Sequence, residues 1–324
     1  MTDADFLLGY LNPEYFAGGE VRVDVAAARR AIEGLAKRVG LAPPDVAWGV
    51  HDVVNENMAS AARVHIAERG RDPRDYALLC TGGAGPVHAY DVARKLGLRQ
   101  VICPPAAGVA SALGLLVAPA RVDRVATVGL RLDRDSGVAL EKAFRKLEDE
   151  ARAVMADTDL KLESASVRRL ADGRFLGQGF DLVVDLPDGP YDDSDATRRR
   201  LTAAFETAYR QKFALTPPAV PIEFINIRVA VRAPVAGDAG AVAASAPSDA
   251  LAAIHRGAVK GVRPAYFPQP RGFVETTVYD RARLASGDEI HGPAVVEEEG
   301  STLVIGPGGI ARVAATGNLI VALP

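Results

Sequence analysis

The feature that most constrains the fold is the segment Tyr76–Gly114, in which short apolar runs alternate with glycine. The apolar run Tyr76–Thr81 predicts a strand, and the helical spacing of apolar residues in Val87–Leu96 predicts a helix with one buried face. A second apolar run, Arg99–Cys103, predicts another strand. Strand, helix and strand in this order form a βαβ unit, which implies parallel strands joined by a right-handed crossover.

The connection between the first strand and the helix is a turn of small residues: Gly82, Gly83, Ala84, Gly85 and Pro86. Glycine permits positive φ and a close approach of the backbone to a ligand, and proline suits the first helical positions. Free N–H groups at the helix start would favour a phosphate or nucleotide in the crevice beyond the strand. Taken by itself, however, the turn favours a plain strand-to-helix connection, because such glycine motifs are common.

Longer segments resemble the hydantoinase A/5-oxoprolinase/ketone carboxylase family. They are, in order, TDADFLLGYLNPEYFAGG (Thr2–Gly19), VVNENMASAARVHIAERGRDPRDYALL (Val53–Leu79), TGGAGPVHAYDVARKLG, VICPPAAGVASALGLLVA, IEFINIRVAVRA (Ile222–Ala233) and DRARLASGDEIHGPAVVEEEGSTLVIGPG (Asp280–Gly308). The resemblance implies an α/β fold, with the glycine turn in the second lobe of an ATPase of the actin/hexokinase/Hsp70 type, close to the adenosine. It also implies ATP with Mg as cofactor, so that Gly82–Pro86 become candidate nucleotide-binding residues.

The same resemblance indicates what the sequence lacks. Full-length members of the family carry a phosphate loop of the form DxGGTxTD ahead of the TDA block, and this sequence begins at that block. We therefore expect the C-terminal half of such a protein. Its nucleotide site would be shared with, or completed by, a partner subunit that carries the missing half.

Composition argues against several other classes of protein. The net charge is −3 and the estimated pI is about 6.0, which gives no reason to expect nucleic acid or an anionic membrane as partner. The 2 cysteines, Cys80 and Cys103, lie in apolar strand candidates and are interpreted as buried, reduced thiols rather than a disulfide or a metal site. No signal peptide or membrane-spanning run is visible, so we expect a cytoplasmic protein.

The resemblance implies a partial hydantoinase A-like ATPase lobe at 1–125, and the pattern of elements predicts an α+β domain at 126–236 and a β-rich module at 237–324. The segment 234–251, rich in Ala, Gly, Ser and Pro, is the best linker candidate. Two local signals are also interpreted. Asp45 is expected to cap a long helix, Asp45–Arg69, and Asp172-Gly173, between two alternating runs, is expected to form a hairpin turn.

Three polar features are candidates for chemistry. His51 and Asn55 share a helix face, and we favour polar residues at a lobe interface over a metal site, because one histidine does not make a site. His88, one turn into the helix after the glycine turn, suits proton transfer or phosphate contact and, equally, a hydrogen bond that locks the turn; it is the only catalytic candidate. The run Glu297–Glu299 is interpreted as a solvated strand edge rather than a cation site. No metal ligands are assigned.

These observations leave three functional hypotheses open. The favoured one is a subunit of a multi-subunit ATP-dependent enzyme, most of all a ketone carboxylase of the acetophenone type. The second is a structural or assembly subunit that no longer binds nucleotide. The third is a subunit of an ATP-dependent hydantoinase or 5-oxoprolinase. In the enzymatic versions, phosphorylation of a weakly reactive oxygen drives an unfavourable step, and the protein positions the groups and stabilises their charge.

Overall fold

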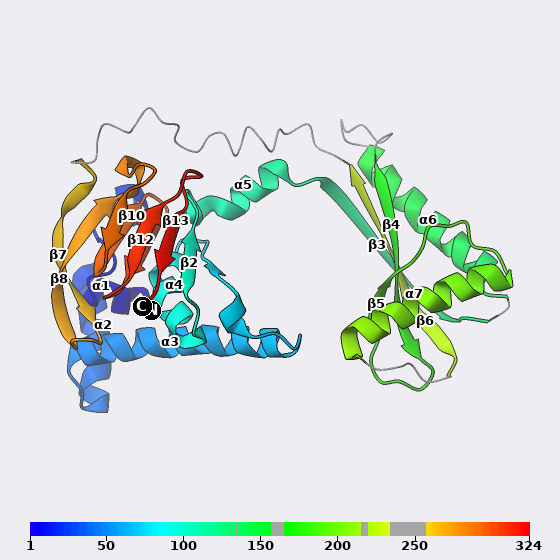
Figure 1. The fold of residues 1–324 in the computed structure, drawn as a ribbon, viewed down its shortest axis with the longest axis horizontal. Helices are drawn as coiled ribbons and strands as arrows, with labels where there is room; N and C mark the ends of the chain where they lie inside the picture. The colour runs from blue at the N-terminus through cyan, green and yellow to red at the C-terminus, as the bar shows by residue number, and fades with distance from the viewer. Residues whose placement is uncertain (134, 157–164, 215–219, 234–256) are drawn as a thin grey trace. The chain divides into compact units, whose positions relative to one another are not determined.

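A computed structural model describes residues 1–133, 135–156, 165–214, 220–233 and 257–324. Within these ranges the chain forms two compact units, Met1–Leu116 with Asp238–Pro324 (unit 1) and Val117–Gly237 (unit 2) (Figure 1). The structure thus groups the segments differently from the three predicted regions, because the C-terminal strands pair with the strand that follows the glycine turn. The predicted linker at 234–251 lies outside the described residues.

Unit 1 contains the helices predicted over Asp45–Arg69 and Val87–Leu96 together with others. They are α1 (Thr2–Leu7), α2 (Val25–Val39), α3 (Pro43–Ala67), α4 (Gly85–Leu96) and α5 (Ala110–Val117), with short 3₁₀ turns η1 (Phe16–Gly19), η2 (Pro73–Asp75), η3 (Ala107–Val109) and η7 (Arg281–Arg283). The prediction that Asp45 caps α3 is wrong. The helix begins two residues earlier, since prolines suit its first turn, and the Asp45 carboxylate instead accepts a hydrogen bond from Tyr266 Oη at 3.0 Å.

Two sheets complete unit 1. One has the order β1-β2-β13-β12-β9 and the other β11-β10-β8-β7. Their bounds are β1 (Leu78–Leu79), β2 (Gln100–Cys103), β7 (Val259–Phe267), β8 (Gly272–Asp280), β9 (Glu289–His291), β10 (Ala294–Glu298), β11 (Ser301–Ile305), β12 (Ile310–Val313) and β13 (Leu319–Ala322). Strands β1 and β2 are parallel on either side of α4, which confirms the βαβ unit, whereas β13 pairs antiparallel with β2.

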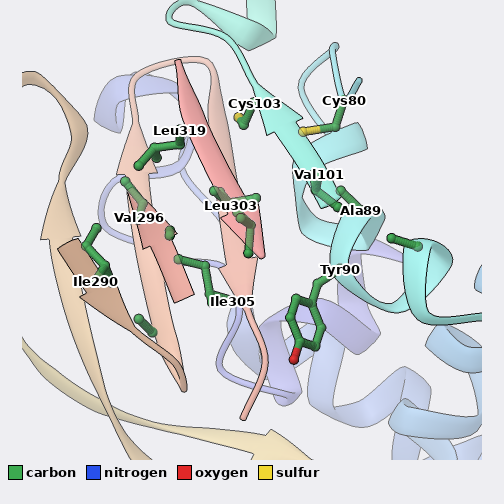
Figure 2. Packing of buried hydrophobic residues seen from close by; sticks show 14 of the residues in the cluster. Cys80, Ala89, Tyr90, Val101, Cys103, Ile290, Val296, Leu303, Ile305 and Leu319 are labelled. Carbon is green, nitrogen blue, oxygen red and sulfur yellow. The ribbon is translucent and has the colours of Figure 1, made fainter. Parts of the chain in front are cut away.

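The core of unit 1 lies between α4 and these strands (Figure 2). Tyr90 of α4 fills the space beside β11, and its hydroxyl donates to the carbonyl oxygen of Pro307 at 2.9 Å. A Cβ at Gly306 would lie 2.2 Å from the Tyr90 ring, so only glycine fits there. The close fit fixes α4, and with it the glycine turn, relative to the C-terminal strands.

Unit 2 is an antiparallel sheet in the order β3-β6-β4-β5 with two helices packed on it (Figure 1). The elements are β3 (Ala120–Arg131), α6 (Gly137–Ala156), β4 (Ser166–Phe175), β5 (Leu182–Asp185), α7 (Asp195–Phe213) and β6 (Ile222–Ala233). Phe144 of α6 and Phe205 of α7 are fully buried in the core. Ile222, Phe224 and Ile227 of β6 are buried in the same core.

The predicted hairpin turn at Asp172-Gly173 is wrong. Strand β4 runs straight through this dipeptide, and the connection to β5 comes after Phe175. Asp172 is held in the strand because its buried carboxylate binds Arg228 and Asn226 of β6, at distances between 2.7 and 3.0 Å. Gly173 is needed since a Cβ there would lie 2.9 Å from the Phe205 ring. Packing thus overrides the local turn signal.

The α/β class is confirmed by the arrangement of the elements in both units. Among the helices of the described part of the chain, none has the length and apolar character needed to cross a membrane.

Candidate functional site

Unit 1 contains a cavity of about 390 Å³ beside the glycine turn. Three segments form its walls: the N-terminal residues with α1, the turn leading into α4, and the end of β10 with the turn to β11. The lining residues are Met1, Thr2, Asp5, Leu11, Asn12, Tyr15, Phe16, Ala17, Gly83, Ala84, Val87, His88 and Glu297–Thr302. The wall opposite the glycine turn therefore comes in part from this chain itself.

Of the five residues predicted to bind the nucleotide, two line the cavity and three do not. Gly83 and Ala84 are exposed and line the cavity, and no acceptor for their N–H groups is found among the described residues. The N–H of Gly82 instead donates to the carbonyl oxygen of Ala107 at 2.7 Å. Gly85 and Pro86 begin α4 and do not line the cavity. Two residues whose main-chain N–H groups have no acceptor in the described chain thus line the cavity, and the N–H of Gly82 holds the turn in place.

His88 of α4 also lines the cavity, and its ring is 5% exposed. Its Nδ1 lies 2.8 Å from Oδ1 of Asn55 in α3. Because an amide oxygen only accepts, Nδ1 carries the hydrogen in this assignment, and Nε2 keeps a free lone pair. Burial and the neighbouring His51 lower the pKa of His88 to about 4, so the ring is neutral near pH 7. Asn55 is thus the hydrogen-bond partner of His88, which the sequence did not indicate.

His51 of α3 and Asp5 of α1 lie next to His88. Nδ1 of His51 is 2.8 Å from Oδ1 of Asp5, and both side chains are buried. The rings of His51 and His88 are stacked, with centroids 4.6 Å apart. Asp5, His51 and His88 present possible metal-ligand atoms within 4.8 Å of one another. In nearly parallel rings the nitrogen lone pairs do not converge, so the observed arrangement favours hydrogen bonding over chelation.

Asp5 was missed as a site residue. It stands in a short segment with no periodicity of its own, and only the packing of α1 against α3 brings it to His51. His51 and Asn55 were expected to lie at an interface between lobes. Their hydrogen bonds instead join α3 to α1 and α4, all within unit 1. No pattern at helical spacing could have indicated this cluster, because its members are distant in sequence.

The prediction that Glu297–Glu299 is a solvated strand edge is wrong for the first two residues. Strand β10 is internal, between β11 and β8, so Glu297 is 1% exposed and is paired with Lys260 and Arg263. Burial acts to raise the pKa of Glu297, but the two cations hold it below its usual range. Glu298 accepts main-chain hydrogen bonds from Ala106 and Ala107 at 2.7 and 3.2 Å. Glu299 is exposed.

The chemistry of the lining is mixed. Main-chain N–H groups of Gly83 and Ala84 can donate hydrogen bonds, while the carboxylates of Asp5 and Glu299 accept them. Apolar side chains such as Phe16 supply the remaining surface. Carboxylates repel phosphate oxygens and bind hydroxyl or amino groups, so this end of the cavity suits a neutral, hydrogen-bonding group better than a polyphosphate.

Two family models match the chain. The hydantoinase/oxoprolinase model matches residues 1–124, and the model of the hydantoinase/oxoprolinase C-terminal domain matches residues 132–316. Among curated proteins, an uncharacterised protein of Methanocaldococcus jannaschii and the caprolactamase subunit alpha of Pseudomonas jessenii are both 31% identical over 95% of this chain. The acetophenone carboxylase gamma subunit of Aromatoleum aromaticum is 27% identical over the same share. The chain spans 42–44% of the length of these relatives.

Two solved structures resemble the chain over 99% of its length. An ATP-dependent caprolactamase from Pseudomonas jessenii has a TM-score of 0.69 at 28% identity. A nucleotide-free acetone carboxylase has a TM-score of 0.73 at 23% identity, which supports the fold alone. The chain covers 46% of each of these structures.

Proposed function

Because the chain belongs to the hydantoinase/oxoprolinase family, we propose that it is a component of an ATP-dependent enzyme whose nucleotide binds at the cavity beside the glycine turn. The observation that carries the proposal is the pair of main-chain donors at Gly83 and Ala84, which face a cavity and have no acceptor in the described part of the chain. Relatives named as caprolactamase and as ketone carboxylase subunits support ATP use at this level.

The residues present fit one part of the nucleotide better than the rest. The carboxylates of Asp5 and Glu299 suit ribose hydroxyls or an exocyclic amine, and the apolar lining suits a base. The same carboxylates disfavour a triphosphate, and this chain contains no second glycine-rich phosphate loop. We infer that this chain holds the adenosine side, and that Mg and the phosphates are held by residues outside it.

A partner subunit, or a further region of the protein, would supply the residues that hold Mg and the phosphates. The chain spans less than half the length of its relatives, several of which are named as subunits. Helix α5 has no buried residue in the described chain, and Leu115 and Leu116 are 78% and 63% exposed. An apolar helix of this kind favours a further protein surface that covers it. We expect the assembly to be cytoplasmic.

Two reaction types fit the family. From the sequence we expect carboxylation of a ketone. In that reaction ATP would activate the ketone or the bicarbonate. Opening of a cyclic amide is the second candidate, which the higher identity to a caprolactamase subunit favours, at 31% against 27% for the acetophenone carboxylase subunit. A non-catalytic assembly role remains the third prediction.

Nucleotide binding tests the proposal directly. Equilibrium dialysis with labelled ATP would be carried out on this chain alone and together with the region or subunit that carries the phosphate loop. We expect tight binding only in the combined protein, and Leu115→Asp should weaken association because it places a charge on the apolar face of α5. Val125→Asp, at an exposed position of β3, is the matched control. Absence of binding in both preparations would favour the assembly role.

Product analysis separates the two reaction types. The combined protein would be incubated with ATP and either a ketone or a lactam, with and without labelled bicarbonate. A carboxylase incorporates the label into an acid product, whereas a lactamase opens its ring without incorporation.

A further inference from the structure

The 2 cysteines of the chain lie at the ends of neighbouring parallel strands. Leu79 of β1 is in register with Ile102 of β2, so the next residues, Cys80 and Cys103, are opposite each other on the same face of the sheet. The Cys80 N–H continues the pairing with a hydrogen bond to the Ile102 carbonyl oxygen at 2.9 Å. Figure 2 shows the Cys80 sulfur directed towards Cys103. Both are free thiols, 5% and 4% exposed.

A guanidinium group lies beside this pair. Nη2 of Arg281 donates to the main-chain oxygens of Gly317 and Cys103, the latter at 3.5 Å. Nη1 is sealed from solvent and has no hydrogen-bond partner among the described residues. Within the same residues no carboxylate forms an ion pair with Arg281, because its contacts are carbonyl oxygens. A buried cation of this kind stabilises nearby anions, and both the Glu298 carboxylate and a thiolate at Cys103 lie within its electrostatic reach.

The two thiols differ in acidity. A hydrogen bond from the Cys80 thiol lowers the pKa of Cys103, and the charge of Arg281 acts in the same direction against burial. The same hydrogen bond, together with burial, raises the pKa of Cys80. Cys103 is therefore the better nucleophile, with a second thiol in contact to resolve an oxidised intermediate.

We propose that Cys80 and Cys103 form an oxidisable dithiol that a hydroperoxide converts to a disulfide. In the first step the Cys103 thiolate attacks a peroxide oxygen, the O–O bond breaks, and a sulfenic acid and hydroxide form. In the second step the Cys80 sulfur attacks the sulfenic sulfur, the S–O bond breaks, and the proton from Cys80 leaves with the oxygen as water. In sum, two thiols and one hydrogen peroxide give one disulfide and two waters.

The position of the pair links this chemistry to the glycine turn. Cys80 is followed directly by Thr81 and Gly82, and Cys103 leads into the segment that contains Ala107. The Gly82 N–H already donates to the Ala107 carbonyl oxygen, so these two connections lie in contact. A disulfide at their base restricts both, and amide hydrogen exchange of residues 81–85 should slow after oxidation.

The test uses the complete protein and hydrogen peroxide, whose small size suits sites that are 4–5% exposed. Intact mass should fall by two hydrogens, a peptide linking Cys80 to Cys103 should appear, and dithiothreitol should reverse both. Two free thiols after treatment of the folded protein would overturn the proposal, as would sulfinic acid at either cysteine without a linked peptide. Cys80→Ser should stop at a sulfenic acid on Cys103, which a dimedone adduct reports.

Arg281 gives a graded control. Arg281→Lys keeps the positive charge and should keep most of the oxidation rate. Arg281→Met removes the positive charge and should raise the pKa of the Cys103 thiol by about one unit. The smaller fraction of thiolate should slow oxidation about tenfold near pH 7. Thermal melting establishes that each variant is folded before its rate is compared. Equal rates in the native protein and Arg281→Met would remove Arg281 from the proposal.

Discussion

Two buried polar clusters, one in each unit, differ in how completely their members are hydrogen-bonded. In unit 2, Arg169 binds Glu141 and Glu148 at 2.6 Å each, and the Tyr191 N–H completes the shell of Glu141. Burial acts to raise the pKa of Glu141, but hydrogen bonds from Arg169, Arg145 and Tyr191 lower it to about 2. The network satisfies its members within the unit, so its role is to join α6 to β4.

The cluster at the cavity of unit 1 is incompletely satisfied. Nε2 of His51 and Nδ2 of Asn55 are sealed from solvent without a hydrogen-bond partner among the described residues. An unsatisfied buried group lowers stability, and it persists where it serves a site. The comparison teaches that burial of charge does not by itself mark function. Incomplete satisfaction beside a cavity is the more informative signal, and the predictions below test that distinction.

The largest expected effect is in unit 2. Arg169→Met removes the guanidinium that Glu141 and Glu148 share and leaves Glu141 with only Arg145 and the Tyr191 N–H, so it should lower the free energy of unfolding by about 3–5 kcal/mol. Urea denaturation measures the loss, and nucleotide affinity of the folded fraction should not change. Arg145→Ala, which removes a largely exposed partner of Glu141, should cost at most about 1 kcal/mol. Equal losses in both variants would mean that Arg169 does not organise the network.

The next effect is a pH dependence that belongs to unit 1. The pKa of His88 is about 4 in the folded protein and 6.5 ordinarily, so the unfolded chain binds more protons between these values. The free energy of unfolding should therefore fall as the pH is lowered from 6.5 towards 4, by up to about 1.4 kcal/mol per pH unit. His88→Gln should remove this part of the slope.

Denaturation curves at several pH values measure the difference between the native protein and His88→Gln. Asp5, His51 and Asp91 also face this region and are present in both proteins, so only the difference between the two curves is assigned to His88. His65→Gln, at an exposed position of α3, is the control and should follow the native curve. Parallel curves for the native protein and His88→Gln would show that His88 is not held neutral by its surroundings.

The sequence predicted most of unit 1 because its signals are local. The glycines of the turn and the apolar stripe of Val87–Leu96 each act within a few residues, and the structure contains the corresponding elements. The resemblance to a family supplied the role of the turn, which local physics left open.

Apart from the Asp45 cap, which local prolines displace, the errors have a common cause in long-range packing. Asp172-Gly173 has the composition of a turn, yet contacts from β6 and α7 keep it in a strand. Glu297 has the composition of a solvated edge, yet Lys260 and Arg263 neutralise it within a sheet. The Asp5–His51–His88 cluster combines residues up to 83 positions apart, so no spacing could indicate it.

A smaller effect is expected at Asn55. Asn55→Leu leaves the Nδ1–H of His88 without its acceptor, and should cost about 1–3 kcal/mol. The His88 ring would also lose its orientation towards the cavity, so ligand affinity should fall with stability. Asn57→Ala, at an exposed position of the same helix, should stay within about 0.5 kcal/mol. If Asn55→Leu lowers stability and leaves affinity intact, the cluster is structural, like the network of unit 2.

The smallest effect on stability, and the sharpest on function, is expected at Gly83. A Cβ there would lie 3.3 Å from the Gly300 carbonyl oxygen, so Gly83→Ala requires a shift of only a few tenths of an ångström and should cost less than about 1 kcal/mol. The methyl group would nevertheless stand beside a main-chain donor that faces the cavity, and nucleotide affinity should fall about tenfold, or about 1.4 kcal/mol. Gly34→Ala, with no atom within 4 Å of the new Cβ, should stabilise α2 by about 0.5–1 kcal/mol and leave affinity unchanged. Since both variants add one methyl group, unchanged affinity in Gly83→Ala would mean that the glycine turn is a connection and that the functional contrast between the units lies elsewhere.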